Sequence, residues 1–352
     1  MADLMRHLKH AVESGASDIF IVAGGPVCEK IEGRLVPAGD EKLMPHDTEE
    51  LITSLYELED RSMEEYKKTG DDDFSFSVKG LARFRVNTYR QRGSMAAVIR
   101  IVSFDIPDWK ELNLPEEVMK LADYSHGMVL FTGTAGSGKS TTQACIIDRI
   151  NSQNNYHIIT LEDPIEYLYR NNKSIISQRE IAVDTPDYLS ALRSCLRQAP
   201  DVIQLGEMRD HETIRTAMTA AETGHLLFAT LHTKGAVNSI DRIIDAFPAG
   251  QQGQIRVQLS MCLKTVVSQQ LVPDVEGNMI PAFEIMHVNS AIRNMIRENK
   301  GHQIDIAIAT GGEEGMITMD QYLAFLCEKG RITRHTAMEF ADNSEQMGRR
   351  LK

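Results

Sequence analysis

Short apolar and polar stretches alternate along the first hundred residues, and this pattern predicts a small α+β domain. Leu4, Leu8 and Val12 recur every fourth residue, which indicates an amphipathic helix at the start of the chain. Residues 18–22 are mostly apolar and lead into a Gly-Gly-Pro turn, as is typical of a strand. The other elements expected here are a strand pair at 29–36 that bends at Gly33, helices at 48–56 and 61–69, and a β-section that begins at residue 71.

Longer apolar strands alternate with helical patterns in the second half of the chain. The elements expected here are strands at 157–161, 202–205 and 226–230, with helices at 185–197 and 211–222. This alternation predicts a mostly parallel sheet that is covered on both faces. The fold class is therefore α/β, with one domain at residues 1–103 and a second at 104–352. From about Gly235 the second domain is expected to be a predominantly helical tail.

A glycine-rich segment directly follows the apolar run 128–132. Its residues are Gly133, Thr134, Ala135, Gly136, Ser137, Gly138, Lys139, Ser140 and Thr141, and they contain the spacing G-x-x-x-x-G-K-S. A strand before the segment and a helix from Lys139 to about residue 151 provide the context of a P-loop, in which backbone N–H groups surround phosphates at a helix N-terminus. We expect the chain to bind ATP, with Lys139 at the β- and γ-phosphates and Ser140 holding Mg²⁺.

Acids and histidines flank three further predicted strands. Glu162 and Glu166 follow the first strand, Glu207 follows the second, and His225 and His232 flank the third. Ligands bind beyond the carboxyl ends of strands in an open parallel sheet. We expect Glu207 to hold the Mg²⁺ shell as a Walker B acid, and Glu166 or Glu162 to orient and deprotonate the attacking water. Each histidine could sense the γ-phosphate, connect nucleotide state to sheet movement, or be a core histidine held by a backbone carbonyl.

An arginine-rich β-hairpin is expected at residues 82–101, with its turn at 91–94. A symmetric turn places Arg85 directly opposite Arg100, and Phe84, Val86, Ile99 and Ile101 on the buried face. Like charges opposed across a ladder are unfavourable, so one interpretation is an anion between the two guanidinium groups. The other is a solvated or carboxylate-paired face. Because Lys139 already serves its own phosphate site, we expect these arginines to approach the ATP of a neighbouring subunit, as arginine fingers do.

Composition narrows the classes of function. The 352 residues carry a formal net charge of −12, so no nucleic-acid partner is expected, because nucleic-acid phosphates would repel the chain. The five cysteines are scattered without a C-x-x-C pair, so neither a disulfide framework nor a zinc site is expected. No stretch approaches the ~20 apolar residues of a membrane span, and no secretory signal is visible. These features favour a cytoplasmic enzyme.

Taken together, the motifs resemble the secretion ATPase superfamily and, within it, the PilT-like type IV pilus retraction ATPases. The segment 133–141 resembles the family's Walker A motif, although Thr134 and Ala135 replace its usual Pro-Thr. Residues 162–166 match its Asp box, whose second glutamate acts as the base, which favours Glu166. Residues 205–210 match its Walker B motif and 223–233 its His box. Arg85 and Arg100 fall where the interprotomer arginines of the family are expected.

Two features are similar to the retraction branch. Residues 291–298 resemble its A-I-R-N-L-I-R segment with Met295 for Leu, although such a helix with Ile292, Met295 and Ile296 on one side is also typical of core packing. The chain also lacks the tetracysteine zinc module and the long N-terminal extension of extension and type II secretion ATPases. Residues 197–201 depart from the family's Arg-Glu-Asp-Pro-Asp, and this leaves open an auxiliary, PilU-like member.

The resemblance implies a fold and a function. The fold is a small N-terminal α+β (PAS-like) domain that supplies interprotomer arginines, followed by a C-terminal RecA-like P-loop ATPase domain. The function is that of a homohexameric motor that couples ATP hydrolysis to pilus retraction, pilin disassembly and twitching motility. Its partners are the inner-membrane pilus platform protein and the pilus machinery, which hold the cytoplasmic ring peripherally at the inner membrane. The alternatives are an auxiliary PilU-like motor, a motor for DNA uptake or protein secretion, and a nucleotide-gated scaffold.

Overall fold

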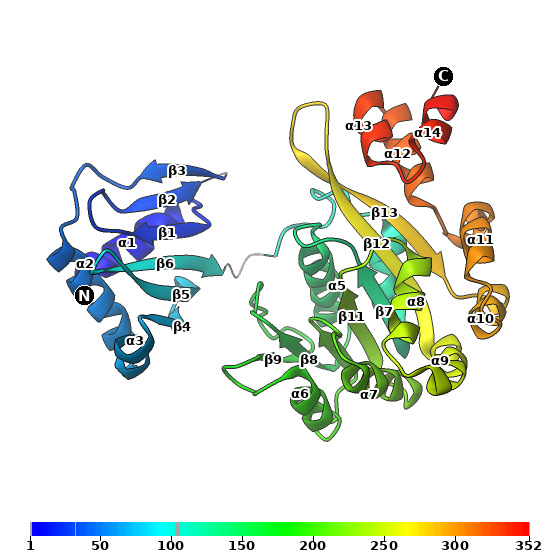
Figure 1. Cartoon of the computed structure of the whole chain (residues 1–352), viewed down its shortest axis with the longest axis horizontal. Helices are drawn as coiled ribbons and strands as arrows, with labels where there is room; N and C mark the ends of the chain where they lie inside the picture. The colour runs from blue at the N-terminus through cyan, green and yellow to red at the C-terminus, as the bar shows by residue number, and fades with distance from the viewer. Residues whose placement is uncertain (1, 32, 103–105, 352) are drawn as a thin grey trace. The chain divides into compact units, whose positions relative to one another are not determined.

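The computed structural model describes residues 2–31, 33–102 and 106–351 (Figure 1). The chain divides into two compact units, the first comprising Met1–Asp105 with Glu166–Leu168, and the second Ile106–Ile165 with Tyr169–Lys352. The boundary predicted between residues 103 and 104 lies outside the described residues. Each unit is considered by itself below.

The first unit is an antiparallel sheet with helices. Among the described residues its strands lie in the order β3 (Arg34–Pro37), β2 (Cys28–Ile31), β1 (Asp18–Ile21), β6 (Ser94–Val102), β5 (Ala82–Gln91) and β4 (Asp71–Val78). Its helices are α1 (Ala2–Glu13), α2 (Pro45–Leu58) and α3 (Glu64–Thr69). Leu4 and Leu8 are fully buried, which confirms the amphipathic first helix. The α+β prediction for this half of the chain is therefore confirmed.

The β5–β6 hairpin has the register predicted from its symmetric turn. Arg92 and Gly93 both have positive φ, the conformation of a two-residue hairpin turn that matches the twist of the strands. Arg85 consequently pairs with Arg100, and on the other face Phe84, Val86 and Ile99 are fully buried while Ile101 is partly buried.

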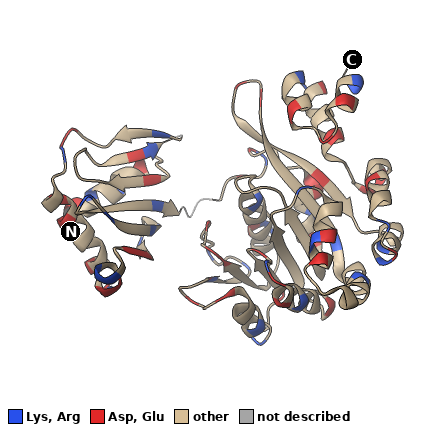
Figure 2. Ribbon diagram, in the orientation of Figure 1, with Lys and Arg blue, Asp and Glu red and all other residues tan. Residues whose placement is uncertain are grey.

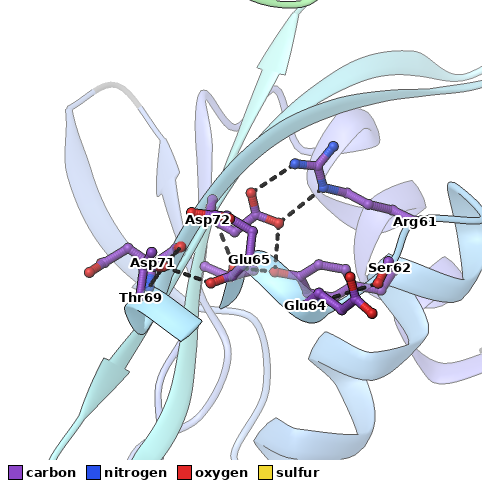
Figure 3. A network of polar contacts seen from close by, with 9 residues as sticks. Arg61, Ser62, Glu64, Glu65, Thr69, Asp71 and Asp72 are labelled. Carbon is purple, nitrogen blue, oxygen red and sulfur yellow. Dashed lines mark hydrogen bonds and ion pairs between the residues drawn. The ribbon is translucent and has the colours of Figure 1, made fainter. Parts of the chain in front are cut away.

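A buried polar network ties α2 and α3 to the edge of this sheet (Figure 3). The Asp72 carboxylate on β4 accepts two hydrogen bonds from the Arg61 guanidinium, at 3.0 Å from Nε and 2.8 Å from Nη2. The Tyr56 hydroxyl lies 3.2 Å from the same carboxylate and 2.7 Å from Thr88 Oγ1. Burial raises the pKa of Tyr56 to about 12, so the phenol remains a proton donor to Asp72.

The second unit is built on a larger, mostly parallel sheet. Within the described residues the strand order is β13 (Met279–His287), β12 (Leu263–Pro273), β7 (Gly127–Thr132), β11 (Leu226–Leu231), β10 (Val202–Leu205), β8 (His157–Glu162) and β9 (Ile175–Glu180). Only the pairing of β12 with β13 is antiparallel among these. The helices of this unit are α4 (Glu116–Met119), α5 (Lys139–Gln153), α6 (Tyr188–Cys195), α7 (His211–Glu222), α8 (Ala236–Asp245), α9 (Ala249–Cys262), α10 (Ser290–Arg297), α11 (Ile304–Thr310), α12 (Met319–Glu328), α13 (Arg334–Phe340) and α14 (Ser344–Arg350).

Both faces of this sheet are buried, as the alternation of strands and helices predicts. Along β7, Met128 and Leu130 belong to one hydrophobic cluster, and Val129 and Phe131 belong to another. Because successive side chains of a strand point to opposite faces, these two clusters cover the two faces of the sheet. The central strands β7, β10 and β11 carry no charged residue, whereas the helices carry charged residues of both signs (Figure 2).

The prediction of a predominantly helical chain from about residue 235 is wrong for residues 263–287, which form the hairpin of β12 and β13 (Figure 1). Glutamines and a serine stand among the β-branched residues of β12 and obscure its pattern as a buried strand. Tertiary pairing determines the outcome, because β12 joins the parallel sheet beside β7, with Val266 opposite Leu130. Helices resume at α10. No helix in the described part of the chain has the length and apolar character to cross a membrane.

Candidate active site

The glycine-rich segment connects the fully buried strand β7 to α5, as the P-loop pattern predicts. A side chain at Gly133 would overlap the backbone carbonyl of Gln269 on β12, and Gly138 begins α5 with a left-handed backbone (φ +85°). Both positions therefore require glycine. The loop lies at the carboxyl end of β7, where the N-terminus of the fifteen-residue helix α5 supplies backbone N–H groups and partial positive charge.

Lys139 lies folded over this loop. Its ammonium group donates hydrogen bonds to the backbone carbonyls of Gly133 at 3.0 Å and Thr134 at 2.7 Å, and its side chain is buried. A phosphate oxygen is a charged and therefore stronger acceptor than these carbonyls. Ser140 and Thr141 follow in the first turn of α5 and are partly exposed. The segment has the arrangement needed to surround a chain of phosphates.

Glu207 and His232 come together at the same edge of the sheet. Glu207 follows β10, and its carboxylate lies 2.5 Å from Arg209 Nη2 and 3.6 Å from His232 Nε2. His232 follows β11, which separates β10 from the P-loop strand β7. The Glu207 side chain is only 10% exposed, although the His232 imidazole is half exposed. A buried acid and an accessible base thus lie beside the phosphate-binding loop.

Glu162 is the last residue of β8 and is also buried. Its Oε1 accepts hydrogen bonds from Thr160 Oγ1 at 2.5 Å and Gln178 Nε2 at 3.3 Å, so the carboxylate links β8 to β9. Glu166 belongs with residues 167 and 168 to the first unit. Its role as a base for water therefore stays a prediction.

His225 lies at the opposite end of the sheet from the P-loop. In the parallel register of β11 with β7, Leu226 pairs with Gly127, whereas Leu231 pairs with Thr132, the residue before the loop. At about 3.3 Å per residue, His225 is roughly 20 Å from His232 along the strand. Its Nδ1 lies 2.9 Å from the carbonyl of Ala220, so the interpretation as a histidine held by a backbone carbonyl fits, and a γ-phosphate sensor in this subunit does not.

Arg85 and Arg100 face one another on the first unit, but one of them has a carboxylate partner. Arg100 Nε donates to Asp18 Oδ1 at 3.0 Å, and Asp18 is also its ladder neighbour on β1. The Arg100 side chain nevertheless remains 65% exposed, and Arg85 is partly exposed. For Arg100 the carboxylate-paired interpretation is therefore correct, while an outward guanidinium face remains accessible.

Sequence reasoning missed the contribution of β12 to this site. Gln269 Oε1 accepts a hydrogen bond from Thr142 Oγ1 at 2.9 Å, which fixes α5 against the strand. A hollow of about 440 Å³ opens beside Gly138 and Thr141, between Gln269 and the segment around Leu112. No local pattern signals these contacts, because they depend on the pairing of β12 with β7.

The edge of the sheet beyond β8 and β10 is negatively charged. Burial raises the pKa of Tyr188, and the charges of Glu207, Asp163 and Glu162 raise it further. Magnesium prefers oxygen ligands such as carboxylates and hydroxyls. The Glu207 carboxylate and the Ser140 hydroxyl are oxygen donors of this kind, so their chemistry fits a magnesium ion.

This geometry defines a P-loop nucleotide site on a RecA-like sheet, and comparisons with known proteins agree with it. Residues 1–322 match the family described as "Type II/IV secretion system protein", so the chain belongs to this family. It is 42% identical to the "Type IV pilus retractation ATPase PilT" of Pseudomonas aeruginosa, over 96% of this chain and 98% of that protein. It is 38% identical to the "Type IV pilus ATPase PilU" of the same organism, over 98% and 90%.

The fold is similar to that of a solved structure described as the pilus retraction motor PilT with bound ADP. The TM-score is 0.90 at 45% identity, and the match covers 98% of each chain. The two-domain fold predicted from the sequence is thereby confirmed. The chain is a P-loop ATPase of the secretion family.

Proposed function

We propose that this ATPase is a motor that couples ATP hydrolysis to the retraction of a type IV pilus, and thus to pilin disassembly and twitching motility. The observation that carries this proposal is the similarity to the pilus retraction motor over 98% of both chains. In helix α10, which carries the retraction-like segment, Ile292 and Ile296 are buried and Arg293 Nε donates to the carbonyl of Ser260 on α9 at 3.0 Å, so the core-packing interpretation of this helix is correct and the proposal rests on the similarity.

In this proposal the P-loop holds the phosphates of ATP. Lys139 exchanges its carbonyl partners for phosphate oxygens, and the hollow beside Gly138 and Thr141 receives the nucleoside. Ser140 directly and Glu207 through water would hold Mg²⁺, which neutralises the charge of the phosphates. The remaining loop residues contribute backbone N–H groups rather than side chains.

Hydrolysis further requires an oriented water molecule and a sensor of the γ-phosphate. We assign the first role to Glu166, because it is the second glutamate of the segment that matches the family's Asp box, whereas Glu162 links β8 to β9. The second role fits His232, which is half exposed beside Glu207. His225 stays outside this set, since it lies at the other end of β11.

The working form in this proposal is a homohexameric ring. Residues 1–103 of one subunit would present Arg85 and Arg100 to the ATP bound by residues 104–352 of the next. Arg85 is partly exposed and lies opposite the exposed Arg100. Two neighbouring positive charges favour an anionic partner, which supports a partner outside the subunit. The partners would be the inner-membrane platform protein and the pilus machinery, which would place the ring in the cytoplasm at the inner membrane.

An auxiliary role is the second candidate, because the chain also matches the PilU protein over 98% of its length. The unusual segment at residues 197–201 supports this alternative. The two roles differ in whether the protein suffices as a retraction motor. A strain that lacks every other retraction ATPase separates them, since an auxiliary motor would fail to restore retraction there.

The decisive experiment counts surface pili and measures twitching in a strain deleted for this protein, complemented by the wild type or by Glu166→Gln. We expect the deletion to leave excess pili and no motility, and only the wild type to correct both. Purified wild-type protein, Glu166→Gln and Glu276→Gln, an exposed control on the β12–β13 hairpin, are assayed for ATP turnover in parallel.

Other outcomes identify other functions. Cells without pili would mean that the motor assembles pili or secretes protein. Full complementation by a Glu166→Gln variant without turnover would indicate a nucleotide-gated scaffold. Pilus numbers and motility that do not change would refute the pilus function altogether.

A further inference from the structure

The loop that carries His232 is fastened at its far end by the β12–β13 hairpin. The backbone N–H of Gly235 donates to Ser268 Oγ at 3.0 Å, and that of Ala236 donates to Glu284 Oε1 at 2.8 Å. Ser268 and Glu284 are cross-strand partners on β12 and β13, and both are almost completely buried. Two neighbouring side chains of the hairpin therefore hold two successive amides after His232.

The same hairpin also holds the P-loop. Ser268 pairs in parallel register with Thr132, the last residue of β7. The following residue, Gln269, packs its carbonyl against Gly133 and accepts the hydrogen bond of Thr142. The P-loop and the His232 loop are thus attached to adjacent positions of one pair of strands.

Glu284 also interacts with the backbone at the start of two helices, α8 and α12. The backbone N–H groups of Ala236, at the start of α8, and Met319, at the start of α12, both stabilise its charged form. The space around the carboxyl is tight, because the cavity that it lines with Thr134 and Lys234 measures about 20 Å³, enough for one water molecule. Movement of the carboxyl therefore requires movement of these elements.

Burying the carboxyl group of Glu284 costs free energy of desolvation. Burial raises the pKa of Glu284 to about 7, and an apolar side chain of similar volume would avoid the desolvation. What an apolar side chain cannot supply is an acceptor for the amides of Ala236 and Met319. The function of Glu284 therefore lies in these hydrogen bonds, of which the one from Ala236 reaches the segment after His232.

We propose that Glu284 is a positioning residue for His232: by accepting the Ala236 N–H, it fixes residues 232–235 and holds the imidazole against the Glu207 carboxylate. The proposal rests on the ATPase mechanism proposed above, in which His232 acts at the γ-phosphate. Substitution of Glu284 affects kcat rather than nucleotide affinity, because the P-loop contacts to phosphate do not involve it.

The test distinguishes the effect of the side-chain length at position 284 from the effect of its charge. In Glu284→Gln the amide oxygen still reaches the Ala236 N–H, whereas Glu284→Asp keeps the charge but is one methylene shorter. We expect Asp and Ala at this position to lower kcat about tenfold with KM for ATP within twofold of wild type, and Gln to keep kcat within threefold. Wild-type kcat in Glu284→Ala, or rescue by Asp but not by Gln, overturns the proposal.

A double-mutant cycle with His232→Ala shows whether the effect passes through the histidine. If Glu284 acts by positioning His232, Glu284→Asp lowers kcat no further in the His232→Ala background. Two independent, multiplicative losses of kcat overturn the inference. Thermal unfolding and ADP binding of each variant identify loss of fold, and Glu276→Gln is the matched control on the same hairpin.

Failure of this inference is distinct from failure of the mechanism. An active wild type that loses turnover in Glu207→Gln, while Glu284→Ala remains at wild-type kcat, refutes the role of Glu284 alone. A wild type without ATP turnover refutes the motor function and the role of Glu284 together.

Discussion

At the residue scale, two glutamates of one segment have different environments although they are four positions apart. Glu162 ends a buried strand and is held by two side chains of β8 and β9. Glu166 lies beyond that strand, in residues that group with the first unit. Glu162 therefore has a structural role in linking β8 to β9, and the role of Glu166 as the base stays a prediction.

We predict that Glu166→Gln lowers kcat at least ~100-fold, since loss of a general base typically lowers the rate 10²–10⁴-fold. Glu162→Gln should instead lower the melting temperature by several degrees and kcat less than tenfold, because a buried acceptor of two hydrogen bonds is altered. Steady-state ATP hydrolysis and thermal unfolding of both variants test this. The reverse pattern would assign the base to Glu162.

At the element scale, the β12–β13 hairpin organises the site. It extends the sheet beyond β7, supports the P-loop through Gln269 and fastens the His232 loop through Glu284. The strands were the main element missed by sequence reasoning, since their polar residues fit neither a period of two nor a helical period clearly. Three of those polar residues contact the P-loop helix or the segment after His232, namely Gln269, Ser268 and Glu284.

Glu284 also gives this hairpin a defined pH dependence. Its pKa is about 7 in the folded protein against 4.5 in the unfolded chain, so between these pH values the folded state holds a proton that the unfolded state releases. The free energy of unfolding therefore falls as the pH rises through this window, by at most about 3 kcal/mol from this group. Below the window the contribution of Glu284 is constant.

We predict that Glu284→Gln, which cannot ionise, gains stability relative to wild type as the pH rises from 5 to 8. Chemical unfolding of both proteins at several pH values measures the difference, and the neighbouring carboxyls of Asp342 and Asp305 remain the same in both. Unfolding curves that shift in parallel at every pH would contradict the raised pKa.

At the scale of the whole molecule, the groups that we propose to act in catalysis are divided between two units. The P-loop, Glu207 and His232 lie on the second unit, and the arginine pair lies on the first. A ring in which each subunit completes the site of its neighbour accounts for this division. If the proposed ring forms, full activity belongs to the assembly rather than to the single chain.

Specific ATPase activity should accordingly rise with protein concentration, and Arg85→Ala should lower kcat of the assembled protein by about 10³, the magnitude typical of an arginine supplied in trans. Arg100→Ala should cost less, because its guanidinium is partly engaged by Asp18. Arg92→Ala, in the exposed turn of the same hairpin, is the control. Activity independent of concentration, or an unchanged Arg85→Ala variant, would contradict the shared site.

Much of the protein follows from local sequence. The P-loop, the buried strands β8, β10 and β11 and the opposition of Arg85 and Arg100 are all encoded by patterns of a few neighbouring residues, because periodicity, glycine conformation and turn geometry act over that range. Local patterns do not state which strands pair or to which edge a residue belongs. The sequence places Glu207 and His232 after their strands and His225 before its strand, and the parallel register confirms that Glu207 and His232 meet. Tertiary structure alone places Gln269 and Glu284 beside the P-loop and the His232 loop, because the pairing of β12 with β7 is set by packing between distant segments.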